Sequence, residues 1–209
     1  MNRADSTMAD SRKTLIIACG AIAHELVAVT RANGFDQFEI QCLPAEWHNT
    51  PQKIVPAIQR KIDEALDRYS RILVAYGDCG TGGQLDRLLE RYNIARLPGD
   101  HCYSFLAGSE VFDAMAEEEL GTFYLTDYLV DNFDRLILEG LGIKRHPELL
   151  TQYFEHYTRV LYLAQDAMHK DREARATEAA CSLGLPLVIH HTGLQPFAHA
   201  MRTIRLTAV

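Results

Sequence analysis

Six short runs of apolar and β-branched residues recur along this chain, and a longer stretch with a helical pattern separates each run from the next. Continuous apolar strands joined by helices need cover on both faces, which favours a parallel sheet. We therefore predict an α/β fold: a mainly parallel sheet with helices on both faces, Rossmann-like and doubly wound, with a less regular insertion around 103–158. The predicted strands are residues 14–19, 38–44, 71–77, 122–127, 159–165 and 185–191.

The segments between these runs have the pattern of amphipathic helices. Residues 51–69 place Ile54, Ile58 and Ile62 on one face, as expected when one side of a helix packs on a sheet. Helices are predicted in the same way for HELVAVTRANG, QLDRLLERYN and REARATEAACSLG. At 209 residues, 47% of them hydrophobic, the chain is long enough for a sizeable core. We expect a disordered tail over 1–13 and a single α/β domain over 14–209.

The charge balance and the apolar runs exclude some classes of partner. A formal net charge of −7 and a pI near 5.7 oppose binding to a phosphate backbone, so we expect no nucleic acid. No apolar run approaches the roughly 20 residues that span a bilayer, and the polar start MNRADSTMADSRK has no apolar core of a signal peptide. We therefore expect a cytoplasmic protein without a membrane partner. In that reducing compartment its five cysteines are expected as core thiols, ligands or nucleophiles, not disulfides.

Three of the cysteines occupy comparable positions at the ends of successive apolar steps. Cys19 ends LIIAC, Cys79 follows ILVAYGD, and Cys102 lies in RLPGDHCYSF. In open parallel sheets ligands bind beyond the carboxyl ends of the strands, so these thiols are the candidates for a shared site. Cys42, in phase with its strand, and Cys181, in an alanine-rich helix, are both predicted to lie in the core.

The spacing of the three thiols suggests a site assembled by the fold. The absence of a CxxC pair argues against a structural zinc ribbon. Two metal options remain open: three thiolates could hold a [4Fe–4S] iron–sulfur cluster with one open iron, or three sulfurs and a nitrogen of His48 or His101 could hold zinc. His48 lies in the loop LPAEWHNTP and His101 precedes Cys102. For each histidine, an ordinary loop position is the alternative.

The stretch AYGDCGTGG, residues 75–83, has more glycines than a simple turn needs. The successive amides of Gly80, Thr81 and Gly82 resemble an anion nest for a small anionic ligand, with a tight strand-to-helix turn as the alternative. Without GxGxxG or a Walker lysine, a nucleotide is not predicted. Asp78 in this stretch and Asp127 at the end of TFYLTD are candidate catalytic residues, as a general base or as a group that orients a bound ligand.

The ordered motifs also resemble a known family, a prokaryotic domain of unknown function numbered 1638. The resemblance covers roughly residues 14–193. It implies that the cysteines at 19, 79 and 102 and the histidines at 48, 101 and 146 belong to the family pattern, and that the protein is associated with corrinoid-dependent methyltransferase systems. It implies no reaction. The motifs that carry the resemblance are IIACGAIAHEL, LPAEWHNTP, ILVAYGDCGTGG, RLPGDHCYSFLAG, EEELGTFYLTDYL, GLGIKRHPEL and YTRVLYLAQ.

Three hypotheses about function follow from these features, and they leave open whether the chain is an enzyme. The first is a metal- or iron–sulfur-binding protein with an open coordination position, in a redox or accessory role in corrinoid-dependent methyl-group metabolism. The second is a non-catalytic partner or chaperone of a corrinoid methyltransferase. The third is a cofactor-independent, racemase-like enzyme in which Cys19 and Cys79 face each other across a substrate.

Overall fold

The computed structural model describes residues 13–33, 37–166 and 170–207, without the side chains of 205–207. Residues 1–12 of the predicted disordered tail lie outside the described residues. All six predicted strands are present, and each bound lies within two residues of the predicted one. The strands are β1 (Thr14–Cys19), β2 (Phe38–Leu43), β3 (Arg71–Ala75), β4 (Thr122–Thr126), β5 (Arg159–Ala164) and β6 (Leu187–His191).

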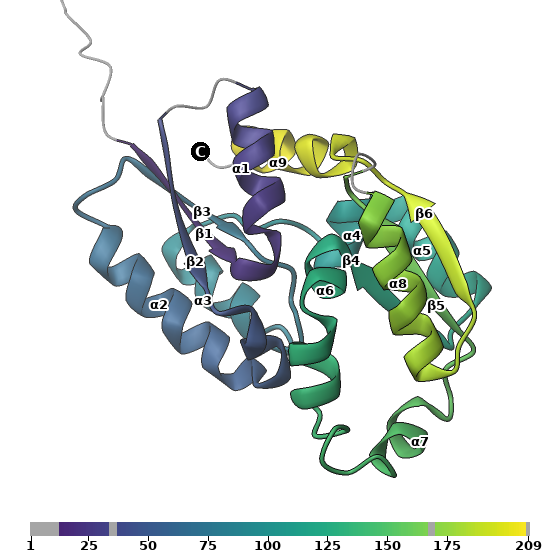
Figure 1. Ribbon diagram of the computed structural model, residues 1–209. Coiled ribbons are helices and arrows are strands. Elements are labelled where there is room, and N and C mark those ends of the chain that lie inside the picture. Colours follow the sequence, from purple (N-terminus) through teal and green to yellow (C-terminus); the bar gives the residue numbers. More distant parts are fainter. Residues whose placement is uncertain (1–12, 34–36, 167–169, 208–209) are drawn as a thin grey trace, which may run out of the picture.

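The strands form two separate parallel sheets, with the orders β2-β1-β3 and β4-β5-β6 (Figure 1). The α/β class and the parallel pairing are as predicted, but the first sheet does not continue into the second. Beyond β3 the chain makes an isolated bridge between Val74 and Arg96, after which Leu97 donates to the Val74 carbonyl. Pro98 follows and has no backbone N–H to extend a ladder. The next strand of the chain, β4, therefore pairs elsewhere.

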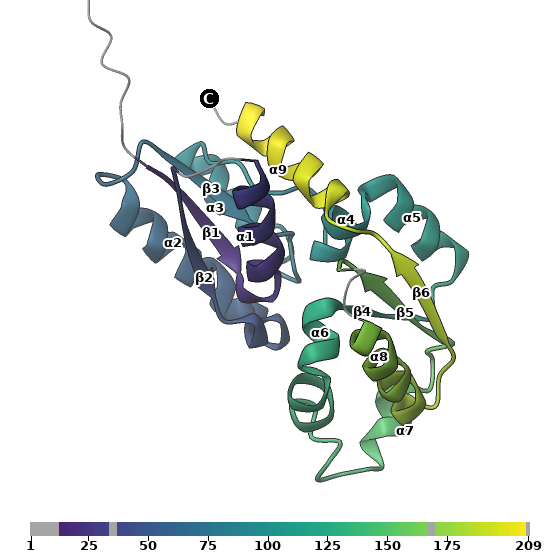
Figure 2. The same ribbon diagram turned by 45° about the horizontal axis from the view of Figure 1, so that its top comes forward.

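Helices cover both faces of the first sheet (Figure 2). α1 and α9 lie against each other on one face, and α2 and α3 on the other. The predicted helices of this half are confirmed, and α2 buries Ile54, Ile58 and Ile62. Three short 3-10 turns follow β1 and β2: η1 (Gly20–Ile22), η2 (Ala45–Asn49) and η3 (Pro51–Lys53). The helices are α1 (Ala23–Ala32), α2 (Ile54–Ala65), α3 (Gln84–Tyr92) and α9 (Gln195–Thr207).

The second sheet is covered in the same way, with α4 and α5 on one face and α6 and α8 on the other (Figure 2). The region 103–158, predicted as less regular, holds several short helices and β4. The helices of this half are α4 (Cys102–Ala107), α5 (Ser109–Glu118), α6 (Asp127–Asp131), the π-helix η4 (Asp134–Glu139), α7 (Leu149–Phe154) and α8 (Lys170–Leu183).

The C-terminal helix α9 connects the two halves. It follows β6 of the second sheet, yet Phe197, Met201 and Ile204 are buried in the core of the first sheet. The Phe197 ring also stacks on Phe105 of α4, with 5.6 Å between ring centroids. Contacts of this kind fix the helices at the boundary between the sheets. Within the described part of the chain, no helix has the length and apolar character to cross a membrane.

All five cysteines are free thiols, as expected, but the predicted burial of two of them was wrong. Cys42 and Cys181 are exposed. Cys42 lies on β2, an edge strand of the first sheet, and precedes the buried Leu43. Cys181 lies off the buried stripe of α8, which consists of Ala176, Ala179, Ala180 and Leu183.

Candidate functional site

Cys19, Cys79 and Cys102 belong to one buried core cluster, which extends from the first sheet to α4. Cys19 ends β1 and accepts a hydrogen bond from the Ala21 amide at 3.5 Å; Cys79 follows β3, and Cys102 begins α4. All three side chains are buried. Burial raises the pKa of each thiol, that of Cys79 to about 12. The negative charge of a neighbouring thiolate raises the pKa further, Cys19 acting on Cys79 and both acting on Cys102.

Cys79 has a left-handed backbone conformation, with φ of 50°. A side chain makes this conformation costly, so glycine or asparagine usually occupies it. Two backbone hydrogen bonds hold the loop there: Cys79 donates to the Asp100 carbonyl at 2.7 Å, and Asp78 donates to the Gly99 carbonyl at 3.1 Å. The loop thereby packs against the segment that leads into Cys102. Strain at a buried thiol suggests that the thiol itself is needed.

The Asp78 carboxylate accepts hydrogen bonds from amides of its own loop. It accepts hydrogen bonds from the Thr81 hydroxyl at 2.6 Å and from the amides of Gly82 and Gly83 at 2.9 and 2.8 Å. Partial burial raises the pKa of Asp78, but these hydrogen bonds outweigh burial, so the pKa lies below its usual value. The candidate cofactor-binding residues Gly80, Thr81 and Gly82 thus form a turn in which Asp78 supplies the anion.

A tyrosine hydroxyl lies beside the thiols. Tyr76 is 1% exposed, and the interaction of its hydroxyl with the Cys19 thiol acts to lower the pKa of that thiol. Burial raises the pKa of Tyr76, and the nearby Cys19 and Cys79 raise it further. The group is therefore a neutral hydroxyl that faces the thiols and could donate a hydrogen bond to a sulfur or to a group bound there.

A cavity of ≈ 240 Å³ reaches the edge of this cluster. It is lined by Cys102, His48 and Tyr103 and by apolar side chains of β4, α6 and η4; Cys19 and Cys79 are not among its lining residues. Burial lowers the pKa of His48, and the nearby His101 lowers it further, so the His48 imidazole is neutral and available as a metal ligand. His101 itself is exposed, and its ring stacks on Tyr103 at 5.9 Å.

The cluster is not a preformed coordination sphere. Among the described residues, no group of three His, Cys, Asp or Glu side chains is arranged so that it could hold a metal ion. The structure thus places the three predicted thiols and His48 in one region, with His101 at its edge.

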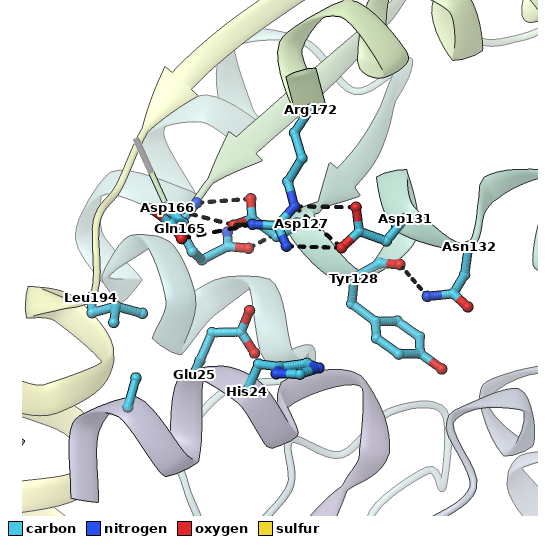
Figure 3. A pocket seen from close by; sticks show the side chains of 11 residues that line it. His24, Glu25, Asp127, Tyr128, Asp131, Asn132, Gln165, Asp166, Arg172 and Leu194 are labelled. Atoms are coloured by element: carbon cyan, nitrogen blue, oxygen red, sulfur yellow. Dashed lines mark hydrogen bonds and ion pairs between the residues drawn. The ribbon is translucent and has the colours of Figure 1, made fainter. Parts of the chain in front are cut away.

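Asp127 belongs to a different cluster, at the carboxyl end of the second sheet (Figure 3). Its buried carboxylate accepts hydrogen bonds from the Tyr162 hydroxyl at 2.7 Å, the amides of Gln165 and Asp166 at 3.1 and 2.9 Å, and Arg172 at 3.0 Å. Gln165 also accepts from the Asp127 amide at 2.9 Å. A carboxylate with four donors joins the ends of β4 and β5 to α8, which is a strong structural role for a residue predicted as a general base.

Sequence reasoning missed Glu25, which lies on α1 opposite Asp127 (Figure 3). Glu25 is 7% exposed, and its Oε2 atom has no hydrogen-bond partner among the described residues. The signal was present in the sequence: Ile22, Leu26 and Val29 form a buried stripe on this helix, and position 25 falls on the same stripe at helical spacing.

Comparison with known proteins gives one match. A family model described as "Protein of unknown function (DUF1638)" matches residues 42–201. This range includes Cys79, Cys102, His48 and His101 and begins after Cys19. No curated protein and no solved structure matches the chain.

Proposed function

The chain belongs to the DUF1638 family of proteins of unknown function, and we propose that it binds a metal ion or an iron–sulfur cluster through Cys19, Cys79 and Cys102. The observation that carries the proposal is that three thiols from separate parts of the chain are buried in one core cluster, where the charge of Cys19 acts on Cys79 and the charges of both act on Cys102. Ordinary core cysteines do not need such an arrangement, and here it is combined with a strained backbone at Cys79.

A cationic occupant would allow the buried thiols of this cluster to ionise. Thiolates are the ligands of zinc and of iron–sulfur clusters, and three buried thiolates without a counter-charge would be strongly disfavoured. A bound metal supplies that charge and releases the thiol protons. Some neighbouring amides already favour thiolates, because Ala21 donates to Cys19 and the backbones of Gly77 and Cys102 act to lower the pKa of Cys79.

The cavity beside Cys102 supports an open position on the metal. Cys102 and His48 both line it, so His48 could serve as a further ligand of a metal held by the three sulfurs, and the cavity could admit a small molecule to that metal. Two forms of the proposal remain. In one, a [4Fe–4S] cluster has its fourth iron open to the cavity; in the other, a zinc ion takes His48 or His101 as its fourth ligand.

A racemase-like function is less well supported by this geometry. Two catalytic thiols must both reach a substrate, whereas Cys102 lines the cavity described above and Cys19 and Cys79 do not. The amides of Gly82 and Gly83 already bind Asp78, so we do not extend the proposal to an anion at that loop. An accessory or partner role for a corrinoid methyltransferase, in the cytoplasm, is part of the proposal that rests on the family resemblance.

The test is elemental analysis of protein purified without oxygen. We expect iron with acid-labile sulfide, or zinc, at about one site per chain. Single serine variants at Cys19, Cys79 and Cys102 should each lose most of it, while the double variant Cys42→Ser/Cys181→Ser, with both exposed thiols changed, should keep it. Circular dichroism identifies any variant that fails to fold.

Two results would overturn the proposal. One is wild-type protein that contains no iron or zinc when purified anaerobically and takes up neither zinc nor iron with sulfide on reconstitution. The other is folded serine variants with unchanged metal content. For the partner role, co-purification with a corrinoid methyltransferase from the native host is expected, and its absence from a tagged pull-down would refute that part alone.

A further inference from the structure

A second cavity, of ≈ 620 Å³, lies between α1 of the first half and the ends of α6 and α8 in the second half (Figure 3). None of the three thiols lines it, so a ligand bound in it does not require the proposed metal site. A volume of this size accommodates a small organic molecule. Its charged and titratable lining residues are Glu25, Asp127, Asp131, Asp166, Arg172 and His24.

The lining carries an excess of negative charge. Four carboxyl groups face one guanidinium and one histidine. Arg172 is already engaged, since it donates to Asp127 at 3.0 Å and to Asp131 at 2.9 Å. Asp131 is held further by Arg175 at 2.8 Å. These pairs fix the wall formed by α6 and α8 and leave it acidic.

Glu25, on the opposite wall, has a carboxyl oxygen, Oε2, without a hydrogen-bond partner among the described residues. Its side chain is 7% exposed and points from α1 toward the Asp127 and Arg172 side of the cavity (Figure 3). Burial raises the pKa of Glu25, and the charge of Asp127 raises it further. A buried carboxyl oxygen without a donor is destabilising, so its persistence points to a donor that the chain itself does not provide.

We propose that this cavity binds a small organic amine in its protonated form, with the ammonium group donating to the Glu25 carboxylate. A cation with N–H donors would balance the negative charge of the lining and would also donate a hydrogen bond to the Glu25 carboxylate. A hard metal ion fits less well, because it requires six or more oxygen ligands, while the Asp127 and Asp131 oxygens are already taken by protein donors. Ala28, Tyr128 and Leu194 also line the cavity and can contact the carbon part of the amine.

Calorimetry with chosen probes tests this assignment. We expect 1-aminopentane and 1,5-diaminopentane to bind, and 1-pentanol, pentanoate and Mg²⁺ to bind at least about tenfold more weakly, because only the amines pair a charge with N–H donors. Glu25→Gln should weaken binding of the amines at least about tenfold. The matched control is Glu64→Gln, an exposed glutamate on α2 that should leave the affinity unchanged.

The wild-type comparison of amine with alcohol needs no variant, so it decides the matter even if Glu25→Gln does not fold. The proposal is overturned if neither amine binds, if the amines bind no better than 1-pentanol, or if folded Glu25→Gln protein binds them with the wild-type affinity. Binding of Mg²⁺ in preference to the amines would also overturn it and would identify a cation site of another kind.

Discussion

Replacing Asp127 with alanine is the most informative perturbation of this fold. The residue was a candidate general base on its sequence position, whereas its contacts indicate that it holds the second half together. Its carboxylate accepts hydrogen bonds from the Tyr162 hydroxyl, the amides of Gln165 and Asp166, and Arg172. The side chain is 4% exposed, so water does not compete for these bonds in the folded protein.

The expected loss of unfolding free energy follows from the donors that Asp127→Ala leaves without an acceptor. Each buried donor that loses its partner costs about 1–3 kcal/mol. Removing one member of a buried ion pair costs about 3–5 kcal/mol. Arg172 keeps Asp131 as a partner at 2.9 Å, and water that enters the vacated space can satisfy some of the amides. We therefore expect Asp127→Ala to lower the free energy of unfolding by about 3–5 kcal/mol, rather than by the sum over all four donors.

Urea unfolding followed by circular dichroism measures this loss. Tyr162→Phe removes only one of the four bonds and should cost about 1–2 kcal/mol. Asp131→Ala is the control: the side chain is 32% exposed and its ion pairs are partly solvated, so its loss should cost about 1 kcal/mol or less. The reasoning is refuted if Asp127→Ala destabilises the protein no more than Asp131→Ala does.

Three further predictions concern the first half. Asp78→Ala should lower the free energy of unfolding by about 1–2 kcal/mol at pH 7. The folded pKa of Asp78 is lowered, so its contribution to the free energy of unfolding is complete above the unfolded pKa of about 3.9 and is lost as the pH falls through the folded pKa. A difference in unfolding free energy between wild type and variant that stayed constant down to about pH 3 in urea titrations would contradict this. A thiol reagent at about pH 8 should modify Cys42 and Cys181 rapidly in the metal-free native protein and the three buried thiols only on unfolding; rapid reaction of a third thiol would be the opposing result. Gly77→Ala places a methyl group 3.0 Å from the His101 carbonyl carbon and should cost about 1–3 kcal/mol in the same urea assay, so wild-type stability of this variant would show that the contact can relax.

Local pattern was a good guide to the elements of this fold. Every predicted strand is present because strand residues here are continuous apolar runs, and α2 was predicted because its isoleucines recur at helical spacing. The same reasoning was wrong for Cys42 and Cys181. Alternation along a strand or membership of an alanine-rich helix does not tell how far a covering layer extends, and both thiols lie beyond it.

The candidate site was partly accessible from sequence. That Cys19 ends one apolar run and Cys79 closely follows another could be read directly from the sequence. The parallel pairing of β1 with β3, which brings the two carboxyl ends to one edge, was known only from the structure. The role of Asp78 could not be predicted from the sequence. A loop that binds an external anion and a loop whose amides bind the Asp78 carboxylate have the same glycine-rich sequence. Only the positions of the Gly82 and Gly83 amides distinguish them.

By itself, the sequence determined the α/β class, the order of strands and helices along the chain, and the position of Cys19 at the end of a strand, because these depend on periodicity and turn chemistry over a few neighbouring residues. Only the tertiary structure decided that the strands divide into two sheets, that α9 returns to the first core, and that Glu25 faces Asp127 across a cavity. Those features depend on which distant segments pack together, and the free energy of such packing is a sum over many contacts that no single segment of the sequence contains.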